Sequence, residues 1–419
     1  MSGFDQLADD TIREIAISLS LNDINKLCSV NQRFNKQIDR NETFWREKYI
    51  RDFSDDSTSY QGNWREHYMR AGTVWVCGYN SCRQLGLDMV GKHTYVNEFT
   101  RLPNLKVKQV STGCRHTVFV DVENDVWVCG DNSGGRLGLG RECKNQSIPT
   151  RIPNFKAQQV SAAVHTVLID LNNNVWVCGP NCNGRLGNGN NEDQFVPVQI
   201  PNIKAKQVSN GGTHTAMIDL DNNVWVCGYN SMGQLGLGGG PIRDMPEKIP
   251  DIDLLGKAKQ VSVGDFYTMI IDSENNVWSC GFNSHGQLGL GDKSSRSTPT
   301  KIPNLKAQQV SAGDKHTIII DLENDVWSWG GNRFGQLGLG DSLDRSTPTK
   351  IPNLKAKQIS AGGAHTVIID LENNVWGCGI NNGRELSIKD STSQYTPIQI
   401  TNIKARRISA GSRCTMIIE

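Results

Sequence analysis

Residues 365–379 read HTVIIDLENNVWGCG, and close relatives of this stretch occur along most of the chain. Each copy contains a Val-Trp pair, with the tryptophans at Trp75, Trp127, Trp176, Trp225, Trp278, Trp327 and Trp376. Successive tryptophans are 52, 49, 49, 53, 49 and 49 residues apart. A near-constant period of this length indicates a repeat architecture. A catalytic constellation is not needed seven times, so the stretch is interpreted as a structural unit.

Each unit consists of short apolar runs separated by turn residues. One copy reads QVSAG, then HTIIID, the turn LEND and VWSWG, followed by a glycine-rich GxNxxGQLGLG segment and IPNLKA. Short β-branched runs bounded by Gly, Asn and Asp are typical of strands and hairpins. Asn and Asp at the turn tolerate left-handed backbone. Four short strands per unit and no helical period predict a mainly β fold, a seven-bladed β-propeller.

The two ends of the repeat region each hold half a unit. The QVS-type segments also number seven, starting near Gln109, Gln159, Gln207, Gln260, Gln309, Gln358 and Arg407. The region opens with the Val-Trp strand at Val74, whereas the last segment stops at Glu419, where such a strand should follow. We therefore predict a propeller over 73–419, closed by pairing of the first and last strands, which hides the edges of an open array.

Histidine and cysteine recur at fixed positions of the unit. Six cysteines share one position, which Trp329 occupies in another copy, so they are predicted to be small buried hydrophobes and not disulfide partners or metal ligands. The histidines are His116, His165, His214, His316 and His365. Whole blades separate them, so several cannot easily meet at one ion. We expect structural histidines, each hydrogen-bonded within its own blade, with no metal site and no cofactor.

The first seventy residues have a different pattern. Ile12, Ile15, Ala16 and Leu19 follow the spacing of one helix face, and three further short helices are expected before residue 53. A linker with a short helix is predicted over 54–72, around NWREHYMR. A helical domain of only 53 residues buries little surface alone, so it is expected to lean on a partner or on the propeller.

Composition limits the classes of partner. The formal net charge is +1, with no basic tail, which argues against nucleic acid. The opening MSGFDQLADD lacks the apolar core of a signal peptide, and no stretch is long and apolar enough to span a membrane. Together with reduced thiols, this predicts an intracellular protein of the cytoplasm or nucleus.

Two sets of motifs carry a resemblance. Gly-x-x-His-Thr before an apolar strand, in phase with GxNxxGQLGLG, resembles the repeats of the regulator-of-chromosome-condensation family over about 73–419. Tyr267 and Cys414 depart from it by replacing the histidine, and RELSIK replaces the glycine-rich pattern at 384–389. The pattern from Leu7 to Trp45-Arg46 resembles an F-box, although Ala8 stands in place of the usual proline.

The combination implies a substrate-recognition subunit of a Skp–cullin–F-box ubiquitin ligase. The F-box would dock on a Skp-type adaptor and through it on a cullin, while the propeller would bind an unknown target protein. The chain would not itself be an enzyme, because the transfer chemistry resides in other subunits. The resemblance places the adaptor-binding residues at Leu7, Ile12, Ile15, Leu19 and Leu27.

Three alternatives stay open. The apolar helix face could pack on the propeller instead of an adaptor. The chain could be a guanine-nucleotide exchange factor for a small Ran-like GTPase, although no unit is long enough for a protruding hairpin. It could also be a non-enzymatic interaction scaffold. Target contacts are expected where the units differ most, at 88–100, 141–147, 190–195, 239–248 and 389–395, on a propeller face that the sequence does not identify.

Overall fold

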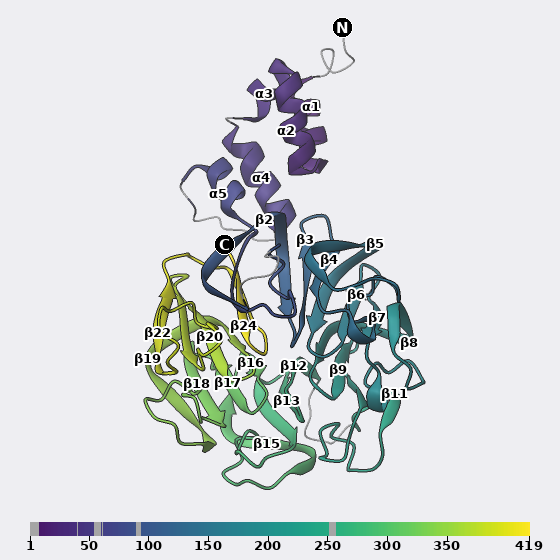
Figure 1. The fold of residues 1–419 in the computed structure, drawn as a ribbon, viewed down its shortest axis with the longest axis vertical. Coiled ribbons are helices and arrows are strands. Elements are labelled where there is room, and N and C mark those ends of the chain that lie inside the picture. The colour runs from purple at the N-terminus through teal and green to yellow at the C-terminus, as the bar shows by residue number, and fades with distance from the viewer. Residues whose placement is uncertain (1–7, 40, 54–59, 61, 89–93, 251–256) are drawn as a thin grey trace.

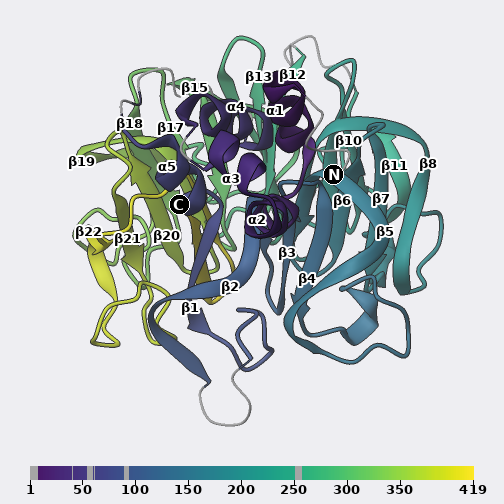
Figure 2. The ribbon, with the colours of Figure 1, turned by 90° about the horizontal axis from the view of Figure 1, so that it is seen from above.

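Five helices precede a ring of antiparallel strands in the computed structural model, which describes residues 8–39, 41–53, 60, 62–88, 94–250 and 257–419. The helices stand on one face of the ring (Figure 1), and from above they lie over its centre (Figure 2). Their bounds are α1 Asp9–Ser18, α2 Leu21–Val30, α3 Gln32–Ile38, α4 Glu42–Phe53 and α5 Trp64–Arg70.

The strands follow from residue 73 onward. Their bounds are β1 Thr73–Tyr79, β2 Tyr95–Thr112, β3 His116–Asp121, β4 Asp125–Gly130, β5 Gln146–Ala162, β6 Thr166–Asp170, β7 Asn174–Gly179, β8 Gln194–Asn210, β9 His214–Asp219, β10 Val224–Gly228, β11 Arg243–Lys248, β12 Ala258–Val263, β13 Tyr267–Asp272, β14 Asn276–Gly281, β15 Arg296–Lys306, β16 Gln309–Ala312, β17 His316–Ile320, β18 Asp325–Gly330, β19 Arg345–Ala361, β20 His365–Asp370, β21 Val375–Gly379, β22 Gln394–Thr401, β23 Arg407–Ala410 and β24 Cys414–Ile418. Short 3-10 turns lie at η2 Ser133–Gly135 and η3 Cys182–Gly184.

Within the described residues, the strand pairings group into seven four-stranded antiparallel units, as the sequence predicts. The long strands β2, β5, β8 and β19 each supply the outer strand of one unit and the inner strand of the next. Hydrogen bonding joins the strands into sheets of 13, 7 and 4 strands, none of which closes on itself.

The expected pairing of the first and last strands is present. β1 runs antiparallel to β24, with Val74 opposite Ile418 and Gly78 opposite Cys414. We call the unit formed by β23, β24, β1 and the outer half of β2 the seam blade, because both ends of the repeat region build it.

Turn chemistry and core packing explain why the repeats adopt this fold. One asparagine in each of six hairpin turns has a positive φ between 66° and 70°, at Asn124, Asn173, Asn222, Asn275, Asn324 and Asn373, a conformation that asparagine tolerates well. The six repeated cysteines are fully buried, as predicted, and Trp329 fills the same place in its blade. Burial raises the pKa of the Cys178 thiol to about 12, so it remains a neutral apolar group.

The helical region has its own small core. Ile12, Ala16, Ile24, Phe34 and Trp45 are buried in one cluster with side chains of α4 and α5. Ser20, Asn31 and Asn63 cap α2, α3 and α5 by accepting hydrogen bonds from backbone N–H groups of the first turn. Among the described residues, no helix is both long and apolar enough to cross a bilayer.

Candidate functional site

One serine hydrogen bond recurs at every junction between neighbouring blades in the described ring. The serine of the QVS motif accepts the backbone N–H of an inner-strand residue in the next blade. The seven N–H to Oγ pairs are Thr112 to Ser409, Ala162 to Ser111, Asn210 to Ser161, Val263 to Ser209, Ala312 to Ser262, Ala361 to Ser311 and Ala410 to Ser360. The QVS motif therefore joins blades as well as forming strands.

The histidines also act between blades, so the expectation of bonds within one blade is wrong. Each Nε2 meets the threonine Oγ1 of the next blade at 2.7–3.0 Å, in the pairs His116 with Thr166, His165 with Thr215, His214 with Thr268, His316 with Thr366 and His365 with Thr415. Burial lowers the pKa of His116 to about 3, which keeps its imidazole neutral. Within the described residues, no group of three His, Cys, Asp or Glu side chains could hold a metal ion.

The two ends of the repeat region meet at the position of a hairpin turn in the seam blade. In the other six blades, the repeated tryptophan Nε1 donates to an aspartate carboxylate six residues earlier, at 2.8–3.0 Å. In the seam blade Trp75 donates instead to Glu419, at 3.3 Å. Gly72, with φ of 73°, donates its N–H to Glu419 O and accepts from Val107 N, as the turn asparagine does elsewhere. Glu419 and Gly72 thus replace the aspartate and asparagine of an uninterrupted turn.

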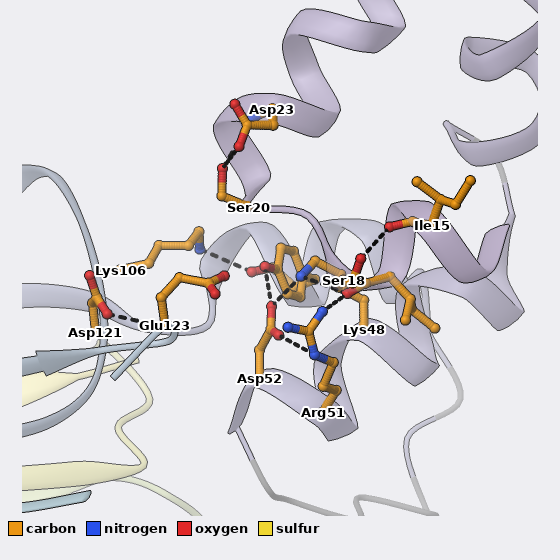
Figure 3. Close-up of polar contacts among 12 residues, drawn as sticks. Ile15, Ser18, Ser20, Asp23, Lys48, Arg51, Asp52, Lys106, Asp121 and Glu123 are labelled. Carbon is orange, nitrogen blue, oxygen red and sulfur yellow. Dashed lines mark hydrogen bonds and ion pairs between the residues drawn. The ribbon is translucent and has the colours of Figure 1, made fainter. Parts of the chain in front are cut away.

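The end of α5 completes this interrupted turn. In four other blades, a lysine donates its Nζ to the carbonyl of the turn glutamate, in the pairs Lys156 with Glu123, Lys306 with Glu274, Lys355 with Glu323 and Lys404 with Glu372. The corresponding Lys106 donates to the carbonyls of Tyr68, Met69 and Ala71 at 3.0, 2.8 and 2.6 Å (Figure 3). The helical region is therefore attached where the propeller lacks a turn.

A buried polar cluster supports this attachment. Lys48 Nζ lies 2.8 Å from Asp52, and the Tyr68 hydroxyl donates to the same carboxylate at 2.7 Å (Figure 3). Desolvation lowers the pKa of Lys48, while burial and then the Asp52 charge raise the pKa of Tyr68. On the propeller side, the Arg406 guanidinium lies 4.7 Å from the centre of the Tyr49 ring. These contacts hold α4 and α5 against the seam blade.

The residues expected to bind an adaptor divide into three groups. Leu7 lies outside the described residues. Ile12 is only 1% exposed, because its side chain packs inside the helical core and offers no surface to a partner. Leu19 and Leu27 are half-buried and pack against that core, and Ile15 is half-buried in α1.

Val30 is a candidate that the predicted set does not include. It ends α2 and is 80% exposed, more than any other large hydrophobic side chain of the described residues. Its place in the stretch LCSV at 27–30, within the F-box-like pattern, was a usable signal. The available apolar surface thus consists of Val30 together with the partly exposed edges of Ile15, Leu19 and Leu27.

The propeller face opposite the helices carries the segments that vary between units. The helices contact the seam blade at Lys106 and Arg406, where inner strands begin. Each Val-Trp strand begins at the face that carries the helices and ends at the opposite face. The variable segments follow these strands and therefore start at the face opposite the helices. Two of them touch across blades, because the Arg141 guanidinium lies 4.3 Å from the Phe195 ring centre. The variable segments therefore begin at the free face, and residues 95–100 and 243–248 continue from it along the outer strands β2 and β11. Residues 89–93 lie outside the described residues.

Two hollows open on this free face. A central one of about 310 Å³ is lined by residues that follow the inner strands, among them Cys114, Asp265 and Asp314. A groove of about 650 Å³ beside it is lined by Asp314, Lys315, Phe334, Ile380, Glu385 and Arg413, among others. Desolvation and then repulsion by Asp265 raise the pKa of Asp314 to about 6. Because Asp314 is exposed to the hollow, water screens part of this effect.

Comparison with known families agrees with this architecture. The sequence model of the regulator of chromosome condensation (RCC1) repeat matches residues 71–120, 123–169, 172–218, 221–271, 274–320 and 323–369. These six repeats cover more than half of the chain, which therefore belongs to the RCC1 repeat family. Beyond residue 369, β21 and β22 complete the unit of β19 and β20, while β23 and β24 complete the seam blade through the pairing of β24 with β1. The helical region lies outside these matches, so the F-box resemblance stays a prediction.

Curated relatives match over single stretches. The bovine "Secretion-regulating guanine nucleotide exchange factor" is 32% identical over 92 residues, 22% of this chain and 20% of that protein. Human "E3 ubiquitin-protein ligase HERC2" is 39% identical over 80 residues, 19% of this chain and 2% of that protein. The chain thus spans a fifth or less of the length of these relatives.

Solved structures share the fold over most of the chain. Yeast RCC1 (Prp20), solved bound to Kap60, has a TM-score of 0.75 and 21% identity, covering 83% of this chain and 89% of that one. Human WBSCR16 has a TM-score of 0.74 and 19% identity, covering 83% and 99%. At this identity the likeness establishes an RCC1-like propeller and nothing about activity.

Proposed function

We propose that this protein is the substrate-recognition subunit of a Skp–cullin–F-box ubiquitin ligase. In this proposal α1 and α2 dock on a Skp-type adaptor, the propeller's free face binds the target protein, and the chain itself catalyses no reaction. The observation that carries the proposal is the attachment of the helical region. Because α5 replaces a turn of the seam blade, the helices sit on one face and leave the variable face open.

The exposed apolar surface of α1 and α2 supports an adaptor site. Val30 is 80% exposed at the end of α2, and Ile15 is half-buried in α1. Burying a large apolar side chain in a helix-to-helix contact contributes about 1.5–3 kcal/mol, so a few such residues suffice for a stable interface. The human relatives named as E3 ubiquitin-protein ligases show that RCC1 repeats occur within ubiquitin ligases.

Co-purification with a Skp-type adaptor tests the proposal. The full chain is expected to elute with the adaptor and to bring a cullin with it. Ile15→Asp and Val30→Asp should each weaken adaptor binding, because a carboxylate would be desolvated at the interface. Val196→Asp is the matched control, since Val196 is 51% exposed on the propeller. Absence of adaptor binding by the native chain, or equal binding by all variants, would reject the proposal.

A second candidate is guanine-nucleotide exchange on a small GTPase. The bovine relative's name and the likeness to yeast RCC1 favour it at the level of the family. Faster release of a fluorescent guanine nucleotide from a Ran-like GTPase would support exchange activity, and an unchanged release rate would reject it. A simple interaction scaffold would show neither adaptor binding nor exchange.

A further inference from the structure

Glu385 is the one carboxylate among seven equivalent positions of the glycine-rich segment. The corresponding residues are Gln84, Arg136, Arg185, Gln234, Gln287, Gln336 and Glu385. The glutamines use Oε1 to accept the backbone N–H of the residue two positions earlier, as Gln336 does from Phe334. Glu385 keeps this structural contact, because its Oε2 accepts from Gly383 N at 2.8 Å.

The exchange of amide for carboxylate changes only the second polar atom. A glutamine places an NH2 donor there, whereas Glu385 places the acceptor Oε1. The Glu385 side chain is fully buried, and Oε1 has no hydrogen-bond partner among the described residues. Arg413 Nε lies 3.9 Å away, beyond hydrogen-bond distance. Burial raises the pKa of Glu385 despite this neighbour, as expected for a carboxylate that is incompletely compensated.

The groove of about 650 Å³ contains Glu385 in its wall. Phe334 and Ile380 supply apolar surface beside it, and Asp314 stands exposed where the groove meets the central hollow. This arrangement has the dimensions of a side-chain pocket, with an apolar wall for a methylene chain and carboxylates for its charged end.

The positive groups of the groove are already engaged or lie in water. The Arg413 guanidinium stacks 4.7 Å from the Tyr79 ring centre and donates to Asn382. Arg333 is exposed and lies over Phe334, and Lys315 is exposed. Asp344, also in the groove, pairs with His285 at 3.0 Å. Because water screens exposed charges, Lys315 and Arg333 oppose a cationic ligand only weakly.

We propose that this groove binds a cationic side chain, lysine or arginine, of the target protein, with Glu385 and Asp314 as the recognising carboxylates. The proposal rests on the proposed function in that it names the chemistry of the target. Glu385 Oε1 is closed to water in this structure, so binding requires the carboxylate to turn towards the groove, where a guanidinium or ammonium group would supply the hydrogen-bond donor that Oε1 lacks. A charge-assisted bond of this kind is stronger than a neutral one.

Methyl NMR on the full chain tests the proposal, because Ile380 lies in the groove. The protein would be labelled at isoleucine δ1 methyl groups, and Ile380→Val would identify the signal. The probes are Nα-acetyl-arginine amide and Nα-acetyl-lysine amide, with the neutral Nα-acetyl-citrulline amide for comparison. Both cationic probes are expected to shift the Ile380 signal to saturation, and the citrulline probe should leave it in place.

Glu385→Gln is the decisive variant, because glutamine is the residue that four other blades use. The variant should fold with a melting temperature no lower than that of the native chain. Its affinity for the cationic probes should be about 10- to 100-fold lower. Glu372→Gln, at an exposed turn on the helical side, is the matched control and should leave binding unchanged.

Several outcomes would overturn the proposal. These are equal shifts with citrulline, undiminished binding by Glu385→Gln, no shift with any probe, or a preference for Nα-acetyl-phosphoserine amide, which would assign recognition to Lys315, Arg333 and Arg413. Adaptor co-purification is measured on the same samples. Loss of adaptor binding with a retained Ile380 response would reject the ligase role alone.

Discussion

The seam blade and the other six blades solve the same structural problem with different residues. In an ordinary blade a continuous hairpin turn connects the histidine strand to the tryptophan strand. In the seam blade the chain is interrupted there, and Glu419, Gly72 and the end of α5 supply the missing contacts. Cys414 also replaces the junction histidine of that blade, and Arg407 replaces the glutamine of QVS. Two departures from the repeat therefore fall in the seam blade, whereas Tyr267 and the segment 384–389 belong to other blades.

This difference shows how one blade performs two tasks. Lys106 occupies the lysine position that binds a turn carbonyl in other blades, and here it binds the carbonyls of α5. Arg406 reaches Tyr49 and so joins the seam blade to α4. Closing the ring and orienting the helices therefore depend on the same few contacts.

Acid should lower the free energy of unfolding more than any substitution below. It acts through the five junction histidines, none of which lies in the seam blade. Burial lowers the pKa of His214 and His316 to about 3 and of His365 to about 4, below the value of about 6.5 in an unfolded chain. Below about pH 6.5 the unfolded state therefore binds more protons, so the free energy of unfolding falls as the pH falls. Each histidine contributes roughly 1.4 kcal/mol per pH unit, and cooperative unfolding is expected near pH 5.

Urea unfolding at a series of pH values between 5 and 7.5 measures this slope. His365→Tyr, which introduces the residue type that Tyr267 supplies in another blade, should reduce proton uptake on unfolding by about one proton at the acid end. A free energy of unfolding that is independent of pH over this range would contradict buried neutral histidines.

Removal of one partner from the buried ion pair behind the seam should have the next largest effect. Lys48→Met leaves the buried Asp52 carboxylate with only the more distant Arg51, whose Nε lies 3.9 Å away, and it is expected to lower the free energy of unfolding by about 3–5 kcal/mol. Urea unfolding followed by far-UV circular dichroism checks this. Arg296→Met is the control, since Arg296 and Asp292 form a solvent-exposed pair whose removal should change the free energy of unfolding far less. Equal losses would show that Lys48 is not buried.

Threonine substitutions compare an ordinary junction with a junction of the seam blade. Thr366 contacts His316 and Thr415 contacts His365, in each case the histidine of the preceding blade. Each threonine hydroxyl also donates to a backbone carbonyl. Thr366→Val and Thr415→Val remove those bonds with little change of volume, and each should lower the free energy of unfolding by about 1–3 kcal/mol. Chemical denaturation of both variants measures the losses. A much smaller loss for Thr415→Val would show that the seam blade is the weaker part of the ring.

The smallest effect is expected at the tryptophan contacts. Asp321 accepts two backbone N–H groups besides the Trp327 indole, whereas Glu419 accepts the Trp75 indole at 3.3 Å. Glu419→Ala should therefore lower the free energy of unfolding by about 0.5–1 kcal/mol, and Asp321→Ala by more. Tryptophan fluorescence during urea unfolding compares the two. The reverse order would show that the seam contact is the stronger one.

The internal comparison of units made much of the fold predictable. The tryptophan period, the strand and turn residues and the half-units at Val74 and Glu419 predicted the repeats and the pairing of β1 with β24. The buried cysteines followed from the exchange with Trp329. The adaptor site was harder to predict from the sequence, because Ile12 shares a helix pattern with surface residues. Only the packing shows that the Ile12 side chain is enclosed.

The local structure of each unit follows from the amino-acid sequence alone, since the alternation of apolar residues and the Asn-containing turns act between near neighbours in the chain. Three features required the folded structure: the histidines join neighbouring blades, α5 replaces a turn, and one oxygen of Glu385 has no hydrogen bond. These contacts join segments far apart in the chain, and identical motifs in every unit do not specify which neighbour each one meets.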